Sequence, residues 1–143
     1  MTQNLYETDF YAWTQQQATY LRERKFDLLD VENLSEEIES LGKQQRQELR
    51  SRLKILLGHL LEWYYQPERR SKSWLYTIRE QRREIRRHLQ ENPSLKPYLA
   101  EAIQLSYENA LDLIGQETPL DPETLPQSCP FSQEQILEEV LQL

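Results

Sequence analysis

Apolar residues recur three or four positions apart along an uninterrupted stretch of the chain from Leu34 to Tyr65. They are Leu34, Ile38, Leu41, Leu49, Leu53, Leu56, Leu60 and Tyr64. This spacing places side chains on one face of an α-helix. No Pro interrupts the stretch, and only Gly42 and Gly58 weaken its helix propensity. The pattern predicts one long amphipathic helix, capped by Asp30, whose apolar stripe faces the core.

The same periodicity predicts three further main helices: about 9–24 after Thr8, 74–91 after Ser73, and from Ser94 to about Gly115. The first carries a stripe that we expect to be buried, consisting of Tyr6, Phe10, Trp13, Gln17, Tyr20 and Leu21. Asn92-Pro93 ends the third helix, because Pro disfavours helical geometry in the residue before it. Short connections between these helices favour antiparallel neighbours.

The last quarter of the chain has a different character. Residues 116–131 contain Pro119, Pro122, Pro126 and Pro130, which predicts a long loop that wraps the surface. In 132–143, the run from Ser132 to Gln135 is a capping-box signature for a short helix over 133–141. We expect the apolar side of this helix to dock on the rest of the protein.

These elements predict an all-α protein: an up-down antiparallel bundle of four main helices plus a short C-terminal helix, in one domain over 1–143. No apolar run approaches the roughly 20 residues that span a bilayer, so we expect no membrane association. The N-terminus has no basic start followed by an apolar run, as a secretory signal would. The single cysteine, Cys129, cannot form an internal disulfide, which favours a reducing cytoplasm.

The formal net charge of −7 conceals a strong asymmetry along the chain. Residues 66–90 hold eight Lys or Arg and three Glu, whereas residues 91–143 hold ten acidic residues and one base, Lys96. Acidic excess argues against broad affinity for nucleic acid, but it permits one local basic face.

Four segments together resemble one protein family: YETDFYAWTQQQ, LSEEIESLGKQQRQEL, HLLEWYYQPERRSKSWLYTIREQRREI and PQSCPFSQEQIL. The family is the bacterial, largely cyanobacterial, domain-of-unknown-function family number 29, and the resemblance covers nearly the whole chain. It implies an all-helical fold and brings no catalytic residues. Any site must therefore be argued from the residues themselves.

One candidate site lies between the second and third helices. His59 flanks the apolar stripe of the long helix, and Gln81 lies near the centre of the next helix's stripe. If the two helices form an antiparallel hairpin, His59 meets Gln81, with Thr77 one turn away, and Arg52 meets His88. We expect His59, Thr77 and Gln81 to form a buried, hydrogen-bonded cluster that fixes the helix register.

A catalytic alternative uses the same helix. Arg52 and His59 fit the Arg-x4–6-His pattern of the HEPN superfamily of helical ribonucleases. That resemblance implies that Arg binds the phosphate and that His helps to activate the ribose hydroxyl. The pattern is not specific, because Arg83 and His88 also match it.

Basic residues suited to phosphate or an acidic partner extend from the preceding loop into the third helix: Arg69, Arg70, Lys72, Arg79, Arg82, Arg83, Arg86 and Arg87. The default interpretation is a solvated face, or one paired internally with Glu101, Glu108, Asp112, Glu138 and Glu139. The sequence favours an interaction or regulatory module over an enzyme. Its partner would be an unknown protein or a second copy, and nucleic acid is the less favoured choice.

No cofactor or metal site is expected from the pattern of potential ligands. Glu37 and His59 are 22 residues apart, or roughly 33 Å along one helix, so they cannot share a metal. Glu37 is instead expected to meet Gln17 of the first helix. Cys129 has acidic residues around it and no predicted His nearby, so we expect an inert thiol.

Overall fold

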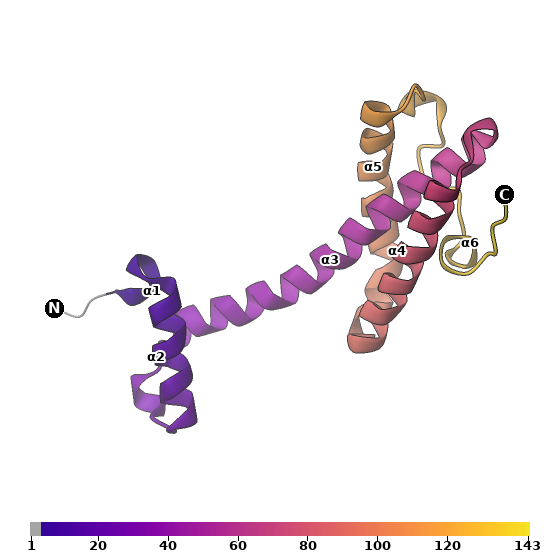
Figure 1. The fold of residues 1–143 in the computed structure, drawn as a ribbon. Coiled ribbons are helices and arrows are strands. Elements are labelled where there is room, and N and C mark those ends of the chain that lie inside the picture. The colour runs from indigo at the N-terminus through magenta and orange to yellow at the C-terminus, as the bar shows by residue number, and fades with distance from the viewer. Residues whose placement is uncertain (1–3) are drawn as a thin grey trace. The chain divides into compact units, whose positions relative to one another are not determined.

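The computed structural model describes residues 4–143, and all regular secondary structure in that range is helical (Figure 1). The α-helices are α1 (Leu5–Thr8), α2 (Phe10–Arg22), α3 (Val31–Tyr65), α4 (Lys72–Glu91), α5 (Leu99–Glu117) and α6 (Gln133–Leu137). Short 3-10 turns cover Phe26–Leu28, Pro67–Arg69, Pro93–Tyr98 and Pro122–Thr124. The predicted all-α class is confirmed. Contacts divide the chain into two compact units, Met1–Gln44 and Gln45–Leu143.

The helix boundaries follow local capping chemistry. The carboxylate of Asp30 accepts from Asn33 N at the start of α3, as predicted, and Ser132 and Gln135 form the predicted capping box of α6. Two predicted caps are wrong: Asp9 rather than Thr8 caps α2, and Ser71 rather than Ser73 caps α4.

Two helix boundaries, the start of α5 and the end of α6, also differ from the predictions. The helix expected from Ser94 begins as the 3-10 segment Pro93–Tyr98, which contains Pro97, and becomes α5 only at Leu99. The helix α6 ends at Leu137, four residues before the expected end.

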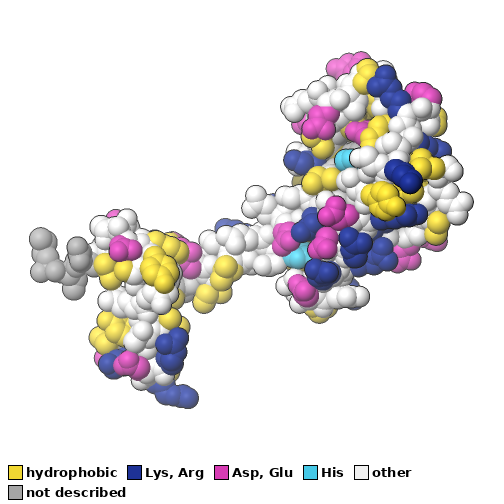
Figure 2. All heavy atoms as spheres, viewed as in Figure 1, with side chains coloured by type: hydrophobic (Ala, Val, Ile, Leu, Met, Phe, Trp, Pro, Cys, Tyr) yellow, Lys and Arg dark blue, Asp and Glu magenta, His cyan; other side chains and the backbone are white. Residues whose placement is uncertain are grey.

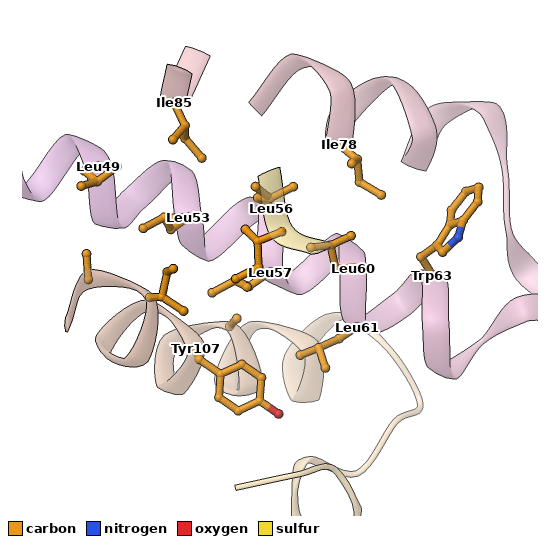
Figure 3. Packing of buried hydrophobic residues seen from close by; sticks show 14 of the residues in the cluster. Leu49, Leu53, Leu56, Leu57, Leu60, Leu61, Trp63, Ile78, Ile85 and Tyr107 are labelled. Carbon is orange, nitrogen blue, oxygen red and sulfur yellow. The ribbon is translucent and has the colours of Figure 1, made fainter. Parts of the chain in front are cut away.

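The core of the second unit forms around the C-terminal part of α3 (Figure 3). Leu53 and Leu56 face α4, whereas Leu57 and Leu61 face Tyr107 on α5. All four leucines are fully buried. Because this part of α3 is covered on two sides, its sequence is apolar over a wide arc rather than along a narrow stripe.

The Pro-rich segment packs against this core. Leu125 is buried, and the hydroxyl of Tyr107 donates to the carbonyl of Pro126. On the other side of the unit, Ile136 of α6 is fully buried. The segment after α5 therefore contributes to the core, in keeping with the predicted wrap.

In the first unit, α2 lies across the beginning of α3 (Figure 1). Trp13 Nε1 donates to the Asp30 carboxylate at 3.0 Å, and Gln17 Oε1 accepts from Asp30 N at 2.8 Å. Glu37 accepts the hydroxyl of Tyr6, so the predicted Glu37–Gln17 pair is wrong. The pair fails because Gln17 is used to anchor the start of α3.

The expected burial of the first unit's apolar stripes is largely wrong. Within the predicted stripe of the first helix, only Trp13 and Gln17 are buried. On α3, Ile38 and Leu41 are 66% and 58% exposed. The stripe of α3 therefore changes from an exposed to a fully buried surface along one continuous helix.

Candidate partner-binding face of α4

Helix α4 separates apolar and basic side chains onto different faces. Leu75, Ile78, Ile85 and Leu89 recur at helical spacing and are buried. Exposed arginines follow a neighbouring line along the helix, and with Gln90 they surround an open depression of about 490 Å³. We call Arg79, Arg83, Arg86 and Arg87 the Arg face. Figure 2 shows Lys and Arg side chains gathered over the second unit, with acidic side chains beside them.

The positive charge of the Arg face is poorly compensated. Arg87 lies 3.6 Å from the carboxylate of Glu84. Arg86 donates to the carbonyl of Arg82, and the Arg79 guanidinium lies 5.9 Å from the ring centre of the exposed Tyr76. Among residues 4–143, no carboxylate lies within 4.0 Å of the guanidinium nitrogens of Arg79, Arg83 or Arg86. Nearby like charges without counterions favour an anionic ligand.

The predicted internal pairing of this face is not found. Five acids were considered as internal partners, with a solvated face as the other possibility: Glu101, Glu108, Asp112, Glu138 and Glu139. None of them forms an ion pair with an arginine in the part of the chain that the structure describes. The carboxylate of Glu139 instead accepts the hydroxyl of Tyr64 at 2.8 Å.

Arg82 is not part of the exposed face, and the prediction that placed it there is wrong. It is only 5% exposed, because its position around α4 falls within the buried arc between Ile78 and Leu75. Its guanidinium donates to the carbonyls of Gln135, Ile136 and Glu139. Burial lowers the pKa of Arg82. Arg82 therefore caps the C-terminal end of α6 rather than facing solvent.

The loop residues of the predicted basic patch have different roles. Arg70 Nε donates to the carbonyl of Trp63 at 2.8 Å, and its guanidinium lies over the Trp63 ring. Arg70 is thus committed to the end of α3. Arg69 and Lys72 are exposed and form no ion pair among residues 4–143.

A polar network joins α3 to α4, but its members differ from those predicted. His88 is 6% exposed, and its Nε2 donates to the carbonyl of Gln45 at 2.9 Å. Its other ring nitrogen lies 3.5 Å from the carboxylate of Glu48. Glu48 also pairs with Arg52, whose Nη1 reaches Gln81 Oε1 at 3.4 Å. Arg52 and His88 therefore meet through Glu48.

The predicted cluster of His59, Thr77 and Gln81 is not joined by hydrogen bonds in the described residues. Gln81 is buried, as expected, but it meets Arg52, two turns before His59 on α3. His59 is half-buried, and its Nδ1 donates to the carbonyl of Ile55 at 2.9 Å. Thr77 is also half-buried. The hairpin register is shifted from the one we assumed.

Arg52 and His59, the two residues of the ribonuclease pattern, bond to different partners in the structure. Arg52 is held by Glu48 and Gln81, whereas His59 bonds to its own helix. The two residues lie seven positions apart on α3, a rise of roughly 10 Å along the axis. The guanidinium that would bind phosphate is thus engaged with a carboxylate and an amide.

The thiol of Cys129 is half-buried, and burial raises its pKa. Its Sγ lies 3.8 Å from the carbonyl of Phe131. Burial is the larger effect and favours the protonated thiol, which is a weak nucleophile.

Sequence analysis missed one buried carboxyl, that of Glu62 on α3. Burial is the main cause that raises its pKa; the charge of Glu117 adds to the increase, and His59 opposes it. A folded-state pKa above the unfolded value means that the charged form is the less stable one in the folded protein. Glu62 therefore weakens the fold near neutral pH.

We expect Glu62→Gln to raise the free energy of unfolding by about 0.5 to 1 kcal/mol at pH 7. The gain should shrink as the pH falls through the raised pKa of Glu62, and should disappear below the unfolded value near 4.3. Urea unfolding at several pH values measures this difference. Glu108→Gln, on the exposed side of α5, is the matched control. An equal gain at low and neutral pH would refute a charge effect.

Within residues 4–143, no cluster of three or more His, Cys, Asp or Glu side chains is arranged to hold a metal ion. In the same range, every helix is too short or too polar to cross a bilayer.

These observations define a small all-α protein whose most distinctive polar feature is a basic helix face on which, among residues 4–143, only Arg87 has a carboxylate within ion-pair distance. The chain belongs to the family described as Domain of unknown function DUF29, whose model matches residues 5–141. Comparison with curated proteins found no match. Comparison with solved structures also found none.

Proposed function

We propose that this protein is a cytoplasmic, non-catalytic interaction module that binds an acidic segment of a partner protein through the Arg face of α4. The observation that carries the proposal is the exposed position of Arg79 and Arg83, with no carboxylate within ion-pair distance among the described residues. Arginine presents a planar fork of donors that matches a carboxylate well.

The dimensions of the face suit a short segment of polypeptide. From Arg79 to Gln90 it follows one side of α4 for three turns, or about 16 Å. A face one helix wide can contact several carboxylates of an acidic peptide or helix. Such contacts give specificity and fast association more than high affinity.

Charge on the rest of the unit favours protein over nucleic acid as the partner. Residues 45–143 carry fifteen Asp or Glu and thirteen Lys or Arg, and the whole chain has a net charge of −7. Proteins that bind nucleic acid through the backbone present broad positive surfaces. Arg52 is paired with Glu48, and burial favours the protonated thiol of Cys129. Both features favour a non-catalytic role.

The test measures the binding of a fluorescent oligo-glutamate peptide and of a single-stranded RNA of equal length by anisotropy across a salt series. We expect the peptide to bind at low salt and to dissociate as salt increases, because exposed charge pairs are screened. Combined Arg79→Gln, Arg83→Gln and Arg86→Gln substitutions should weaken binding about tenfold to a hundredfold, at roughly 0.5 to 1 kcal/mol per charge pair.

The control removes three positive charges from the first unit by Arg22→Gln, Arg24→Gln and Lys43→Gln, and should bind as the wild type does. Tighter binding of RNA than of peptide would favour a nucleic-acid-binding protein instead. RNA cleavage that His59→Ala abolishes would establish the ribonuclease. Absence of binding to both probes at low salt would contradict a functional Arg face.

A further inference from the structure

The exposed apolar surface of this protein is concentrated in its first unit. Of the large apolar side chains that are exposed, eight lie in residues 4–44 and five in residues 45–143, although the second unit is more than twice as long. Figure 2 shows several of these side chains, coloured yellow, on the first unit. A contiguous exposed apolar surface in a soluble protein marks an interaction site.

Part of this surface forms a groove of about 470 Å³ between α2 and α3, all within the first unit. Its apolar lining consists of Phe10, Trp13, Ala18 and Leu21 from α2, and Leu34, Ile38 and Leu41 from α3. One charged residue, Glu37, lines the groove, and its carboxylate accepts the hydroxyl of Tyr6. The groove therefore presents apolar surface with little unsatisfied charge.

We propose that this groove binds the same groove of a second copy of the chain, forming a two-fold symmetric dimer. The exposed area fits this occupant. Phe10, Leu21, Ile38 and Leu41 are 48%, 47%, 66% and 58% exposed. At roughly 200 Å² for a fully exposed large side chain, they present about 400 Å² of apolar surface.

A stable interface of standard size buries about 800 Å² on each partner, of which about 60% is apolar. The groove thus supplies most of the apolar surface that each half of a dimer requires. In a two-fold contact the same patch serves both copies. The ridge of Ile38 and Leu41 on one copy can fill the space beside the small Ala18 on the other.

Gly42 provides a second, independent observation. It lies in the interior of α3, where Gly is less stable than any residue but Pro. A Cβ atom built at Gly42 would meet nothing within 4 Å, so packing inside the chain does not require Gly there. Gly42 follows Leu41 and is one turn from Ile38, which places it beside the exposed stripe. The close approach of a helix from a second copy would explain why Gly occupies this position.

The test is sedimentation equilibrium of the full chain over a wide concentration series. We expect a monomer–dimer equilibrium, and combined Ile38→Glu and Leu41→Glu should raise the dimer dissociation constant about tenfold or more. Both side chains are more than half exposed, so the monomer should keep its fold. The matched control is Tyr11→Glu with Val31→Glu, which adds the same charge at exposed positions outside the groove.

Gly42→Gln gives a second measure that does not endanger folding, because Gln favours helix more than Gly does. It should weaken the dimer while helix content, measured by circular dichroism, stays level or rises. Salt should strengthen the dimer, because residues 1–44 carry nine acidic and four basic residues on each copy. This salt dependence is opposite in sign to that expected for the Arg face, so the two surfaces can be tested separately.

A wild-type chain that stays monomeric at every concentration and salt would overturn the proposal. So would a dimer that is insensitive to the groove substitutions. A monomer that binds a synthetic basic amphipathic peptide through Ile38 and Leu41 would assign the groove to a partner helix instead.

Discussion

Replacing Arg82 with Met is expected to lower the free energy of unfolding by about 2 to 4 kcal/mol. Arg82 is buried and donates to three carbonyls at the C-terminal end of α6, and no other side chain among residues 4–143 does so. Met removes all three bonds and leaves the carbonyls without these donors. Denaturant unfolding measures the loss.

The loss should be concentrated at the end of the chain. Hydrogen exchange in Arg82→Met should show lower protection over residues 132–141 than over α3, because the bonds from Arg82 help to hold α6 to α4. Arg82→Lys should recover only part of the stability, since one ammonium cannot reproduce the planar fork. Arg86→Met, on the exposed face of α4, is the control. Equal stability of the Arg82 and Arg86 variants would refute the capping role.

Leu57→Ala is expected to cost about 2 to 5 kcal/mol of stability. The side chain is fully buried on the side of α3 that faces α5, and its removal leaves a cavity that close-packed neighbours fill only in part (Figure 3). Thermal or urea unfolding measures the effect.

Leu105→Ala, in which the leucine is 40% exposed on α5, provides the control and should cost well under half as much. A small effect at Leu57 would mean that the second unit is not held together by the α3–α5 contact.

The sequence predicted the helices well because their periodicity and capping signals are local. The single helix through residues 34–65, the Asp30 cap and the capping box at Ser132 all appear in the structure. The same periodicity could not predict what covers a stripe. It groups Ile38 with Leu53 on one face, yet one is exposed and the other fully buried. Burial depends on which elements pack there, and that is not local information.

The candidate site was predicted less completely, for two physical reasons. Arg82 was grouped with the exposed arginines of this helix, although its helical position places it among buried residues. The spacing of Arg82 from Leu75, Ile78 and Ile85 places it on the same buried side of the helix, so the sequence does contain this signal. The partner of Gln81 depends on the register of the α3–α4 hairpin, which the short connection sets. In the structure Gln81 bonds to Arg52, which lies two turns before His59 on α3.

The central claim, that the Arg face binds an acidic protein segment, is tested most directly by photo-crosslinking in the native host. A benzophenone amino acid at position 83 reports what contacts the face, and the same group at the exposed position 101 on α5 is the control. We predict that position 83, and not 101, cross-links to one protein, and that the linked peptide is rich in Asp or Glu. Adducts to nucleic acid, or the same pattern at both positions, would contradict the claim.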